Sequence, residues 1–356
     1  MAVFCPGCVV VTGGAGFIGS AFVRHALVQD ARVVVLDALT YAGLRANLLP
    51  LVGHDRFTFV EGDIRDTDLV RRLLLDYGAD TIVHFAAESH VDRSIAGPQA
   101  FVETNVLGTQ SLLDAARTVW GLRDDVRFHH ISTDEVYGDL PFDAPPFTEE
   151  TPYAPSSPYA ASKAGSDHLV RAAHRTYGLP VTITNCSNNY GPRQYPEKLV
   201  PLALSNAIKG HPITLYGDGR QRRDWLHVDD HCDAVWLVLT RGAIGRTYNV
   251  GGSAEVDNLA LVRTLCGLLD ERLPQSPHAP HADLVQFVAD RPGHDRRYAV
   301  DTGRIERELG WSPKQTLAAG LAATIDWYLA HPEWLEAVQH EKGALAAVGA
   351  SGEVEA

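Results

Sequence analysis

Residues Val9–Gly19 read VVVTGGAGFIG: an apolar run ends in closely spaced glycines, and a helical pattern follows. This order is typical of the strand, turn and helix that open a dinucleotide-binding α/β unit. Gly13 is expected to allow the tight turn and Gly16 to let the backbone approach a pyrophosphate, while Gly19 lets the helix pack closely on the strand. The N–H groups at the start of that helix favour a phosphate. The stretch therefore predicts a nucleotide-binding site at one edge of a sheet.

Short apolar runs alternate with longer amphipathic segments through the first half of the chain. Strands are expected at Cys8–Thr12, Arg32–Asp37, Phe57–Val60, Thr81–Phe85, Val126–Ser132 and Val181–Cys186. Helices are expected at Ile18–Gln29, Leu69–Tyr77, Pro98–Val119 and Tyr159–Tyr177. Apolar strands separated by helices are typical of a parallel sheet covered on both faces. The pattern predicts an α/β fold with a Rossmann-type doubly wound parallel sheet.

The regular alternation ends near residue 188, where Gly, Pro and charged residues become more frequent. Further helices are expected at Asp229–Thr240, Asn258–Leu269 and Thr302–Leu309. We therefore expect a dinucleotide-binding Rossmann domain over 1–187, to which part of 226–250 returns, and a smaller C-terminal α/β substrate lobe over 188–340. The Pro- and His-rich segment Leu269–Leu284 is expected to be a loop, and 341–356 a flexible tail.

Composition excludes several classes of protein. The 356 residues include 31 Lys and Arg against 44 Asp and Glu, a formal net charge of −13, which excludes a generally basic nucleic-acid-binding protein. The apolar stretches are too short to span a bilayer. The apolar run near the N-terminus leads directly into the glycine motif, so we expect no signal peptide.

The cysteines indicate neither a disulfide framework nor a metal site. Five are scattered along the chain, and Cys5 and Cys8 form a CxxC pair. No second Cys or His pair completes a zinc site, and the pair precedes a strand instead of opening a helix. We expect these thiols to be inert, no bound metal, and a reducing, cytoplasmic compartment.

Acidic residues end the next two strands and favour a particular cofactor. Asp37 lies 18 positions after Gly19, where a carboxylate can accept both hydroxyls of an adenosine ribose and repel a 2′-phosphate. NAD is therefore preferred over NADP. Asp63 follows the third strand, where it could accept from the adenine amino group. Small residues after the fourth strand, such as Ala86, would let the cofactor pass close to the backbone.

Tyr159 and Lys163 begin a predicted helix at i, i+4 spacing, so both project from one face. A phenol has a pKa near 10 and is a poor base at neutral pH. A neighbouring ammonium, together with a positive nicotinamide, would stabilise the phenolate. The pair thus predicts a base for removing a hydroxyl proton.

Two carboxyl groups, Asp134 and Glu135, follow Thr133 at the end of the fifth predicted strand. Adjacent acids in a cleft cannot ionise equally easily, so their pKa values should separate into one acid and one base. Chemistry that uses an acid, a base and a transient hydride acceptor is elimination of water from a sugar. Oxidation at C4 acidifies the C5 proton; a base removes it while an acid protonates the departing C6 hydroxyl.

These motifs together resemble the extended short-chain dehydrogenase/reductase superfamily, and within it the dTDP-glucose 4,6-dehydratases. The resemblance runs over nearly the whole chain. It is carried by TGGAGFIGS from Thr12, DALTYAG from Asp37, AAESHVDRSI from Ala86, STDEVYG from Ser132, SPYAASKA from Ser157, NCSNNYGPRQYPEKL from Asn185, YGDGRQRRDWLHVDDH from Tyr216 and RPGHDRRYA from Arg291.

The resemblance implies that Thr133 hydrogen-bonds the C4 hydroxyl, Tyr159 takes its proton, Glu135 removes the C5 proton and Asp134 protonates the C6 hydroxyl. Lys163 would hold the nicotinamide ribose and tune Tyr159. The expected NAD-binding residues are Gly13, Gly16, Phe17, Ile18, Gly19, Asp37, Ala38, Leu39, Thr40, Asp63, Ile64, Phe85, Ala86, Ala87, Glu88, Ser89, Thr104, Tyr159, Lys163 and Asn189.

An anionic nucleotide sugar needs a local cluster of cations in an acidic protein. The candidates are Lys198, Arg223, Arg291 and His294. The resemblance adds further substrate-binding residues: Ser89, Thr133, Asn188, Leu199, Thr214, Leu215, Tyr216 and Asn258.

The residues leave three alternatives open. A UDP- or CDP-linked 4,6-dehydratase would keep the acid pair and change the contacts to the base. A 4-epimerase would need only Thr133, Tyr159 and Lys163. A non-enzymatic NAD-sensing protein of the same fold would have no reason to keep the Tyr/Lys pair together with both carboxyl groups.

A homodimer is also expected. The helices predicted at Pro98–Val119 and Tyr159–Tyr177 carry apolar residues beyond what one sheet face needs, namely Phe101, Val106, Leu112 and Leu113. Helix pairs of this kind associate into four-helix bundles in the superfamily that the chain resembles.

Overall fold

A computed structural model describes residues 3–290, 293–338 and 340, and it contains a seven-stranded sheet in the order β10-β6-β5-β4-β1-β2-β3. All neighbouring strands run parallel. The strands are β1 (Cys8–Thr12), β2 (Arg32–Asp37), β3 (Phe57–Glu61), β4 (Thr81–His84), β5 (Arg127–Thr133), β6 (Val181–Cys186) and β10 (Thr247–Val250). The order reverses at β1, as in a doubly wound sheet. The predicted Rossmann-type fold is confirmed.

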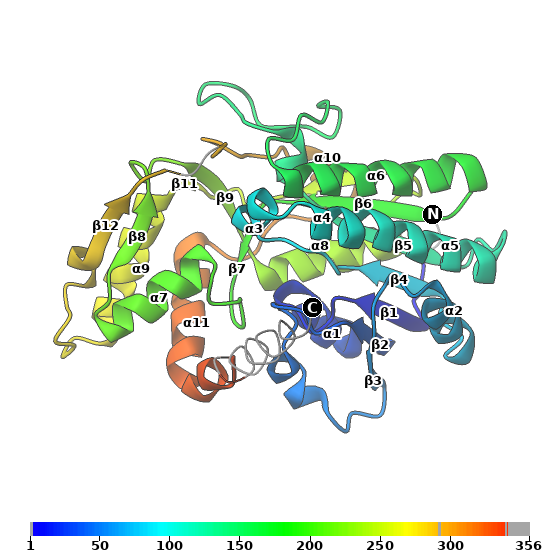
Figure 1. Cartoon of the computed structure of the whole chain (residues 1–356), viewed down its shortest axis with the longest axis horizontal. Coiled ribbons are helices and arrows are strands. Elements are labelled where there is room, and N and C mark those ends of the chain that lie inside the picture. The colour runs from blue at the N-terminus through cyan, green and yellow to red at the C-terminus, as the bar shows by residue number, and fades with distance from the viewer. Residues whose placement is uncertain (1–2, 291–292, 339, 341–356) are drawn as a thin grey trace, which may run out of the picture.

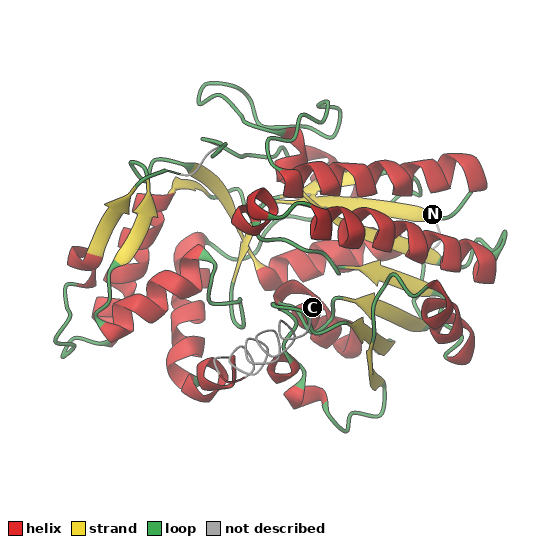
Figure 2. Ribbon diagram, viewed as in Figure 1, coloured by secondary structure: helices red, strands yellow, loops and turns green. Residues whose placement is uncertain are grey.

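Helices cover both faces of this sheet (Figures 1 and 2). One face packs against α2 (Thr67–Asp76), α5 (Thr109–Trp120) and α6 (Pro158–Tyr177), and the other against α1 (Phe17–Val28) and α8 (Val228–Arg241). Successive strand residues point to opposite faces, so both must be apolar. In β1, Val10 joins the first core while Val9 and Val11 join the second.

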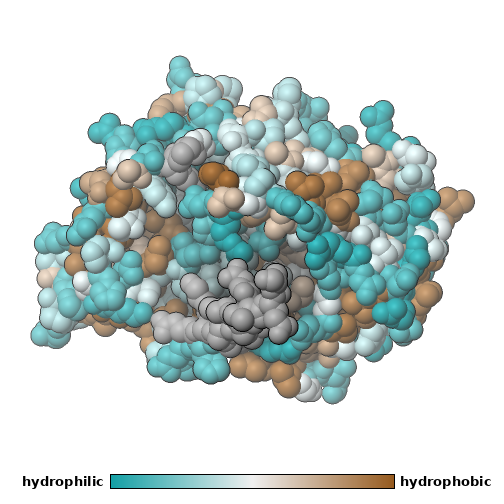
Figure 3. Space-filling view, viewed as in Figure 1, coloured by the Kyte–Doolittle hydropathy of each residue, from teal (hydrophilic) through white to brown (hydrophobic). Residues whose placement is uncertain are grey.

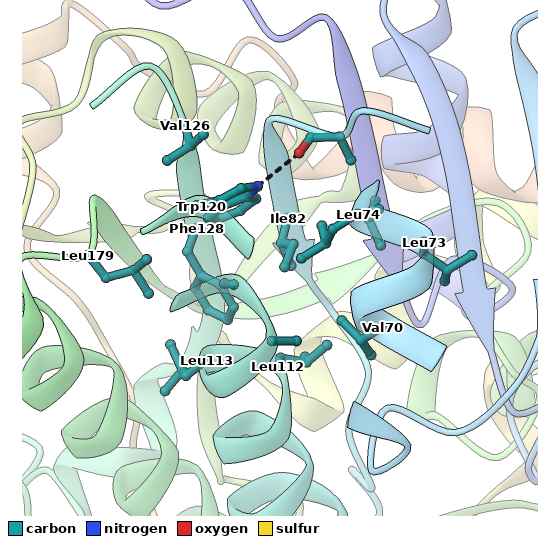
Figure 4. Packing of buried hydrophobic residues seen from close by; sticks show 14 of the residues in the cluster. Val70, Leu73, Leu74, Ile82, Leu112, Leu113, Trp120, Val126, Phe128 and Leu179 are labelled. Atoms are coloured by element: carbon teal, nitrogen blue, oxygen red, sulfur yellow. Dashed lines mark hydrogen bonds between the residues drawn. The ribbon is translucent and has the colours of Figure 1, made fainter. Parts of the chain in front are cut away.

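The core beneath α2 and α5 is close-packed (Figure 4). Phe128 and Ile82 from neighbouring strands belong to the same buried cluster as Leu112 from α5 and Leu74 from α2. The Trp120 indole is buried at its edge and donates to the Ala79 carbonyl oxygen at 2.9 Å, so its one polar atom is satisfied.

In the part of the chain that the structure describes, the smaller lobe contains two short sheets and several helices that share one core. Its strands are β7 (Asn188–Tyr190), β9 (Arg222–His227) and β11 (Glu255–Asp257) in one sheet, and β8 (Ile213–Tyr216) and β12 (Val285–Val288) in the other. Its helices include α7 (Leu199–Lys209), α9 (Asn258–Arg272) and α11 (Leu317–Ala330), and residues 332–338 are also helical. The short helices α3 (Val91–Ala96), α4 (Gln99–Phe101) and α10 (Gly303–Leu309) belong to the larger body (Figure 1).

Several sequence-based expectations need correction. The helix expected over Pro98–Val119 is interrupted by a π-helical segment at Val102–Gly108. Helices α7 and α11 were not anticipated, and α9 extends to Arg272, into the expected loop. The expected tail at 341–356 lies outside the described residues. Strand boundaries agree to within one residue.

Strand β10 lies at the edge of the large sheet beside β6, although it follows β7, β8 and β9 of the smaller lobe in the chain. Helix α8 precedes it and packs against α1. The chain therefore crosses between the two bodies more than once. Within the described ranges, no helix has both the length and the apolar character that a membrane span requires.

Candidate active site

A cavity of roughly 360 Å³ opens at the carboxyl ends of the central strands. Such a position, beside the reversal of strand order, is where doubly wound sheets bind ligands. Its walls come from the glycine turn, the ends of β2, β4 and β5, the start of α6, and residues 186–198. The last of these segments begins the smaller lobe, so both bodies contribute to the cavity.

The glycine turn is shaped for close approach of a ligand to the backbone. Gly13 has φ +68°, and a Cβ there would lie 2.6 Å from the Ala86 nitrogen. A Cβ on Gly19 would lie 2.1 Å from the Gly13 carbonyl oxygen. Gly16 caps α1 without a side-chain hydrogen bond, which leaves the first N–H groups of the helix available to a phosphate. These features fit the pyrophosphate of a dinucleotide.

Asp37 lines the cavity with its carboxylate held in place by backbone groups. It accepts from the Ala15 N–H at 2.9 Å and from the Leu39 N–H at 2.8 Å. Burial raises the pKa of Asp37, and these two hydrogen bonds act in the opposite direction. Each carboxylate oxygen keeps a lone pair for a ribose hydroxyl. The residues present therefore fit NAD.

Most other expected cofactor residues also line the cavity: Phe17, Ile18, Ala38, Thr40, Asp63, Ile64, Phe85, Ala86, Ala87, Glu88, Ser89, Thr104 and Asn189. Leu39 does not; it packs against the apolar core of the α1 face. Asp63 is engaged by Arg65, whose guanidinium donates to it at 2.7 and 3.0 Å and whose N–H donates at 2.8 Å. These bonds hold the pKa of Asp63 below its usual value although burial acts the other way.

Four of the five expected catalytic residues line the cavity: Thr133, Glu135, Tyr159 and Lys163. Asp134 is only 2% exposed and lies outside that lining. The Thr133 hydroxyl donates to its Oδ1 at 3.2 Å. Burial, with the negative charge of Glu135, raises the pKa of Asp134 well above its usual range. Burial and the neighbouring charge therefore favour the protonated form of Asp134 over its carboxylate.

The pKa of Tyr159 is set mainly by burial and by neighbours other than Lys163. Burial, and next the charge of Glu135, raise the pKa of Tyr159 well above 10, while a hydrogen bond with Thr133 lowers it. The Lys163 ammonium donates to the Ile131 carbonyl at 2.8 Å and lies 3.4 Å from His130 Nε2. The protein's own groups, taken together, thus leave the pKa of Tyr159 above its usual value. A nicotinium charge beside the phenol would act in that direction.

A buried polar network lies beneath Lys163, and sequence reasoning did not identify it. Asp167, one helical turn after Lys163, is fully buried and accepts from the Ser132 hydroxyl and the Tyr153 phenol, each at 2.8 Å. His130 Nε2 lies 3.2 Å from its other oxygen. Burial lowers the pKa of Lys163 to about 8, and the charge of Asp167 opposes that change.

The expected substrate residues fall into two groups. Ser89, Thr133, Asn188 and Lys198 line the cavity, and the Lys198 ammonium donates to the Ser89 carbonyl at 3.3 Å. The others that the structure describes lie outside the lining: Leu199, Thr214, Leu215, Tyr216, Arg223, Asn258 and His294. Arg291 lies outside the described residues.

The expected substrate residues outside the cavity lining belong to the smaller lobe, and they differ in their burial and in their contacts. The Leu215 side chain is buried in the lobe's core, whereas Tyr216 is exposed and meets the His294 ring edge-on at 6.0 Å. Arg223 is 6% exposed; its guanidinium donates to the Asp295 carbonyl at 2.8 Å and lies over the Tyr298 ring. Arg223 is therefore oriented by protein groups and lies outside the cavity lining, and its role in binding the substrate stays a prediction.

Other functional-site residues were missed. Tyr41, Ser187, Gln194 and Glu197 line the cavity. Ser187 stands beside Asn188 in a segment already singled out, so its position was a usable signal. Asn105 had no such signal: it is 1% exposed and its amide bridges the Glu88 backbone and the Ser162 hydroxyl.

All five cysteines are free thiols. No group of three or more potential ligand side chains is found among the described residues. Cys8 is buried, which raises the pKa of its thiol to about 11, and Cys5 is exposed.

The dinucleotide cradle, the Tyr/Lys pair and the carboxyl pair on one doubly wound sheet define an extended short-chain dehydrogenase/reductase with elimination chemistry. Comparisons with known proteins agree. Residues 10–324 match the family model described as GDP-mannose 4,6 dehydratase. The chain is 54% identical over 347 residues to dTDP-glucose 4,6-dehydratase of Xanthomonas campestris pv. campestris (strain B100), which covers 96% of this chain and 99% of the relative.

Two further relatives support the same assignment. dTDP-glucose 4,6-dehydratase of Salmonella typhimurium is 53% identical, with 93% of this chain and 95% of the relative covered. The crystal structure of DesIV, a dTDP-glucose 4,6-dehydratase from Streptomyces venezuelae solved with NAD bound, is 52% identical with a TM-score of 0.84, covering 92% of this chain and 98% of that one. The chain belongs to the dTDP-glucose 4,6-dehydratase family and is an NAD-dependent hydro-lyase, as its motifs predicted.

Proposed function

We propose that this protein converts dTDP-glucose to dTDP-4-keto-6-deoxyglucose, a step of deoxysugar biosynthesis. The observation that carries the proposal is the pair of unlike acids beside the phenol: Asp134, which is buried and has a raised pKa, and Glu135, which lines the cavity. Elimination of water from a sugar uses one acid and one base on neighbouring atoms. A simple dehydrogenase or a 4-epimerase has no use for this pair.

NAD, when bound at the glycine turn, supplies oxidation of the sugar at C4 and the matching reduction at C6. Gly13, Gly16 and Gly19 would admit its pyrophosphate, and Asp37 would accept the adenosine ribose hydroxyls. Lys163 would hold the nicotinamide ribose. Its ammonium is oriented by the hydrogen bond that it donates to the Ile131 carbonyl.

The protein's side chains would move three protons. Tyr159 takes the proton of the C4 hydroxyl, which Thr133 orients. Glu135 removes the C5 proton once C4 is a ketone, because the ketone acidifies it. Asp134 gives its proton to the C6 hydroxyl, so that water rather than hydroxide leaves. The raised pKa of Asp134 supports this last role, since it keeps the donor protonated until it is needed.

Positive charge for the diphosphate would come from Lys198 at the cavity and from the cations of the smaller lobe. Ser89 and Asn188 would contact the sugar side of the substrate, in keeping with their position in the lining. The remaining expected residues, among them Tyr216, Asn258 and His294, would meet the nucleotide at the far end. Asn258 Oδ1 is buried without a hydrogen-bond partner among the described residues, which suits a ligand contact.

The test is to incubate the purified protein separately with dTDP-glucose, UDP-glucose and CDP-glucose. We expect an alkali-labile 4-keto product from dTDP-glucose, with no net consumption of added NAD. Product from UDP- or CDP-glucose at a higher rate would replace the dTDP assignment. Formation of the C4 epimer without a keto product would favour the epimerase.

We further propose that the protein acts as a homodimer in the cytoplasm. Of the residues first offered for the interface, Phe101, Leu112 and Leu113 are buried in the chain's own core and do not support it. Other apolar side chains in the same part of the chain support the homodimer, because they are exposed: Ile95, Val102 and Leu107 are 44%, 49% and 54% exposed. Figure 3 shows hydrophobic surface over α4 and the adjoining helix layer, within an otherwise largely hydrophilic face. Light scattering at micromolar concentration would test it, and a monomer would refute it.

A further inference from the structure

A tryptophan near the C-terminal end of the described chain reaches back to the first lobe. The Trp334 indole N–H donates to Asn47 Oδ1 at 2.9 Å, across 287 positions of sequence. Trp334 is 5% exposed and Asn47 is 1% exposed. A side-chain hydrogen bond between two buried groups is well shielded from competing water. The contact therefore ties residues 332–338 to the segment after β2.

Asn47 passes this contact on to the glycine turn. Its Nδ2 donates to the Ala15 carbonyl oxygen at 2.9 Å. An indole nitrogen can only donate, so the bond from Trp334 requires the oxygen of the amide to face Trp334. The amide nitrogen must then face Ala15. The indole thus fixes which end of the Asn47 amide meets the turn.

Ala15 lies between Gly14 and Gly16 and is fully buried. Its carbonyl accepts from Asn47 and also from the Leu44 N–H at 3.0 Å, while its own N–H donates to Asp37 at 2.9 Å. One peptide segment thus joins the pyrophosphate turn to the carboxylate proposed for the ribose. Asn47 holds this segment without being part of the cavity lining.

We propose that Trp334 is a positioning residue for NAD: through the amide of Asn47 it holds the Ala15 peptide, and with it the glycine turn and Asp37, in the arrangement that binds the dinucleotide. The C-terminal part of the substrate lobe thereby contributes to NAD retention without touching NAD. The inference depends on NAD binding and is independent of which nucleotide sugar is the substrate.

The ring of Trp334 also packs in the core of the smaller lobe, with centroids 5.6 Å from Trp327 and 5.8 Å from Tyr328. A purely structural role would therefore change stability and leave the affinity for NAD unaltered. The variant Trp334→Phe distinguishes the structural role from the positioning role, because it keeps an aromatic ring and removes the N–H donor. Asn47→Asp is the second variant, since it keeps the acceptor for Trp334 and loses the donor to Ala15.

The matched control is Trp311→Phe. Trp311 is equally buried, at 5% exposure, but its indole nitrogen has no hydrogen-bond partner within the described part of the chain. Replacing it removes the same atoms from a core without removing a hydrogen bond. Its effect on NAD affinity measures what loss of packing alone does.

The experiment is equilibrium dialysis of each holoenzyme against a series of NAD concentrations, with bound NAD quantified after denaturation and Tm measured in parallel. We expect Trp334→Phe and Asn47→Asp each to weaken NAD binding by roughly threefold to tenfold, the effect of one lost hydrogen bond. Trp311→Phe should retain the parent affinity. The double variant should bind NAD no more weakly than the weaker single variant, because both act through one amide.

NAD affinities within twofold of the parent for both Trp334→Phe and Asn47→Asp would overturn the proposal, whatever the change in Tm. Equal weakening by Trp311→Phe would overturn it as well, since packing would then account for the effect. Because dialysis measures NAD and not turnover, failure here would leave the proposed dehydratase activity intact.

Discussion

The Thr133 hydroxyl donates to the carboxyl group of Asp134 at 3.2 Å, so the proposed contact to the sugar's C4 oxygen and the proposed acid touch one another. Asp134 is buried behind Thr133, whereas Glu135, the next residue, lines the cavity. Two acids adjacent in sequence thus stand in different environments. Burial raises the pKa of Asp134 and so favours its acid form, whereas Glu135 faces the cavity in which we propose that it acts as the base.

Replacing the base should separate oxidation from elimination. In Glu135→Gln the residues that act at C4, namely Thr133, Tyr159 and Lys163, are retained. We expect the variant to form NADH on mixing with substrate and then to stall, with dehydration slowed about 10²- to 10⁴-fold. Stopped-flow absorbance of NADH is the measurement. Tyr159→Phe is the control, because it should form no NADH; dehydration by Glu135→Gln at near the parent rate would show that the acid pair is not the elimination machinery.

Replacing the acid should stall the reaction one step later. Asp134→Asn cannot protonate the C6 hydroxyl, and hydroxide is a poor leaving group. We expect NADH to form while loss of water slows by about 10²- to 10⁴-fold. Exchange of the sugar's C5 hydrogen with deuterated solvent distinguishes the two variants: Asp134→Asn keeps the base and should exchange, while Glu135→Gln should not. Identical exchange in both would contradict the assignment of acid and base.

The central sheet could be predicted because its strands are buried on both faces and must therefore be apolar throughout. Val33–Leu36 is such a run, and the observed strand ends within a residue of the prediction. The glycine turn could be predicted for a related reason, since Gly13 and Gly19 stand where any side chain would collide with backbone. These constraints are local, so they are visible in the sequence.

The features that were missed depend on contacts between distant segments. Asp167 belongs to the site because it contacts His130 and Ser132, and these contacts form only when β5 packs against α6. Asn105 bridges two segments from within a π-helical turn, and nothing in its neighbourhood distinguishes that turn from a regular helix. Helix α11 gives no clear helical period because apolar residues occupy both of its faces: Leu321, Ile325 and Tyr328 are buried, while alanines stand at exposed positions.

Removing the buried charge beneath Lys163 should shift the pH profile. Burial lowers the pKa of Lys163 to about 8, and the Asp167 carboxylate limits that fall. If the ammonium form is needed, activity declines as pH rises through this pKa. In Asp167→Asn the opposing charge is gone, so we expect the alkaline limb of kcat/KM to move to lower pH by about one unit.

Ser132→Ala is the matched control for that shift, since it removes one hydrogen bond to the same carboxylate and leaves the charge in place. Its alkaline limb should stay at the parent pH even if its rate falls. An unchanged limb in Asp167→Asn would mean that the titrating group is not Lys163.

The buried histidines should make the protein acid-sensitive well above the range where carboxylates titrate. Burial lowers the pKa of His129 to about 3, of His130 to about 4 and of His231 to about 3, from 6.5. Each histidine stays neutral in the folded state while the unfolded chain binds a proton below pH 6.5. Their contribution to stability is therefore complete above pH 6.5 and is lost progressively as pH falls toward 3 to 4, by up to about 1.4 kcal/mol per pH unit for each group.

Buried acids with raised pKa values, such as Asp134, take up protons in the folded state and act in the opposite sense. The slope of stability against pH is therefore a sum, and a single non-titrating substitution isolates one contribution. His129 suits this, because its two ring nitrogens contact only the Thr182 and Thr184 hydroxyls, at 2.8 and 3.1 Å, and no charged group. We expect the free energy of unfolding of His129→Gln to be lower than that of the parent at pH 7.5. Between pH 6 and 5 this free energy should fall less steeply in the variant, because its unfolding takes up close to one proton fewer. Urea unfolding at saturating NAD over that range measures the difference, and parallel curves for the two proteins would show that His129 is already protonated in the folded state.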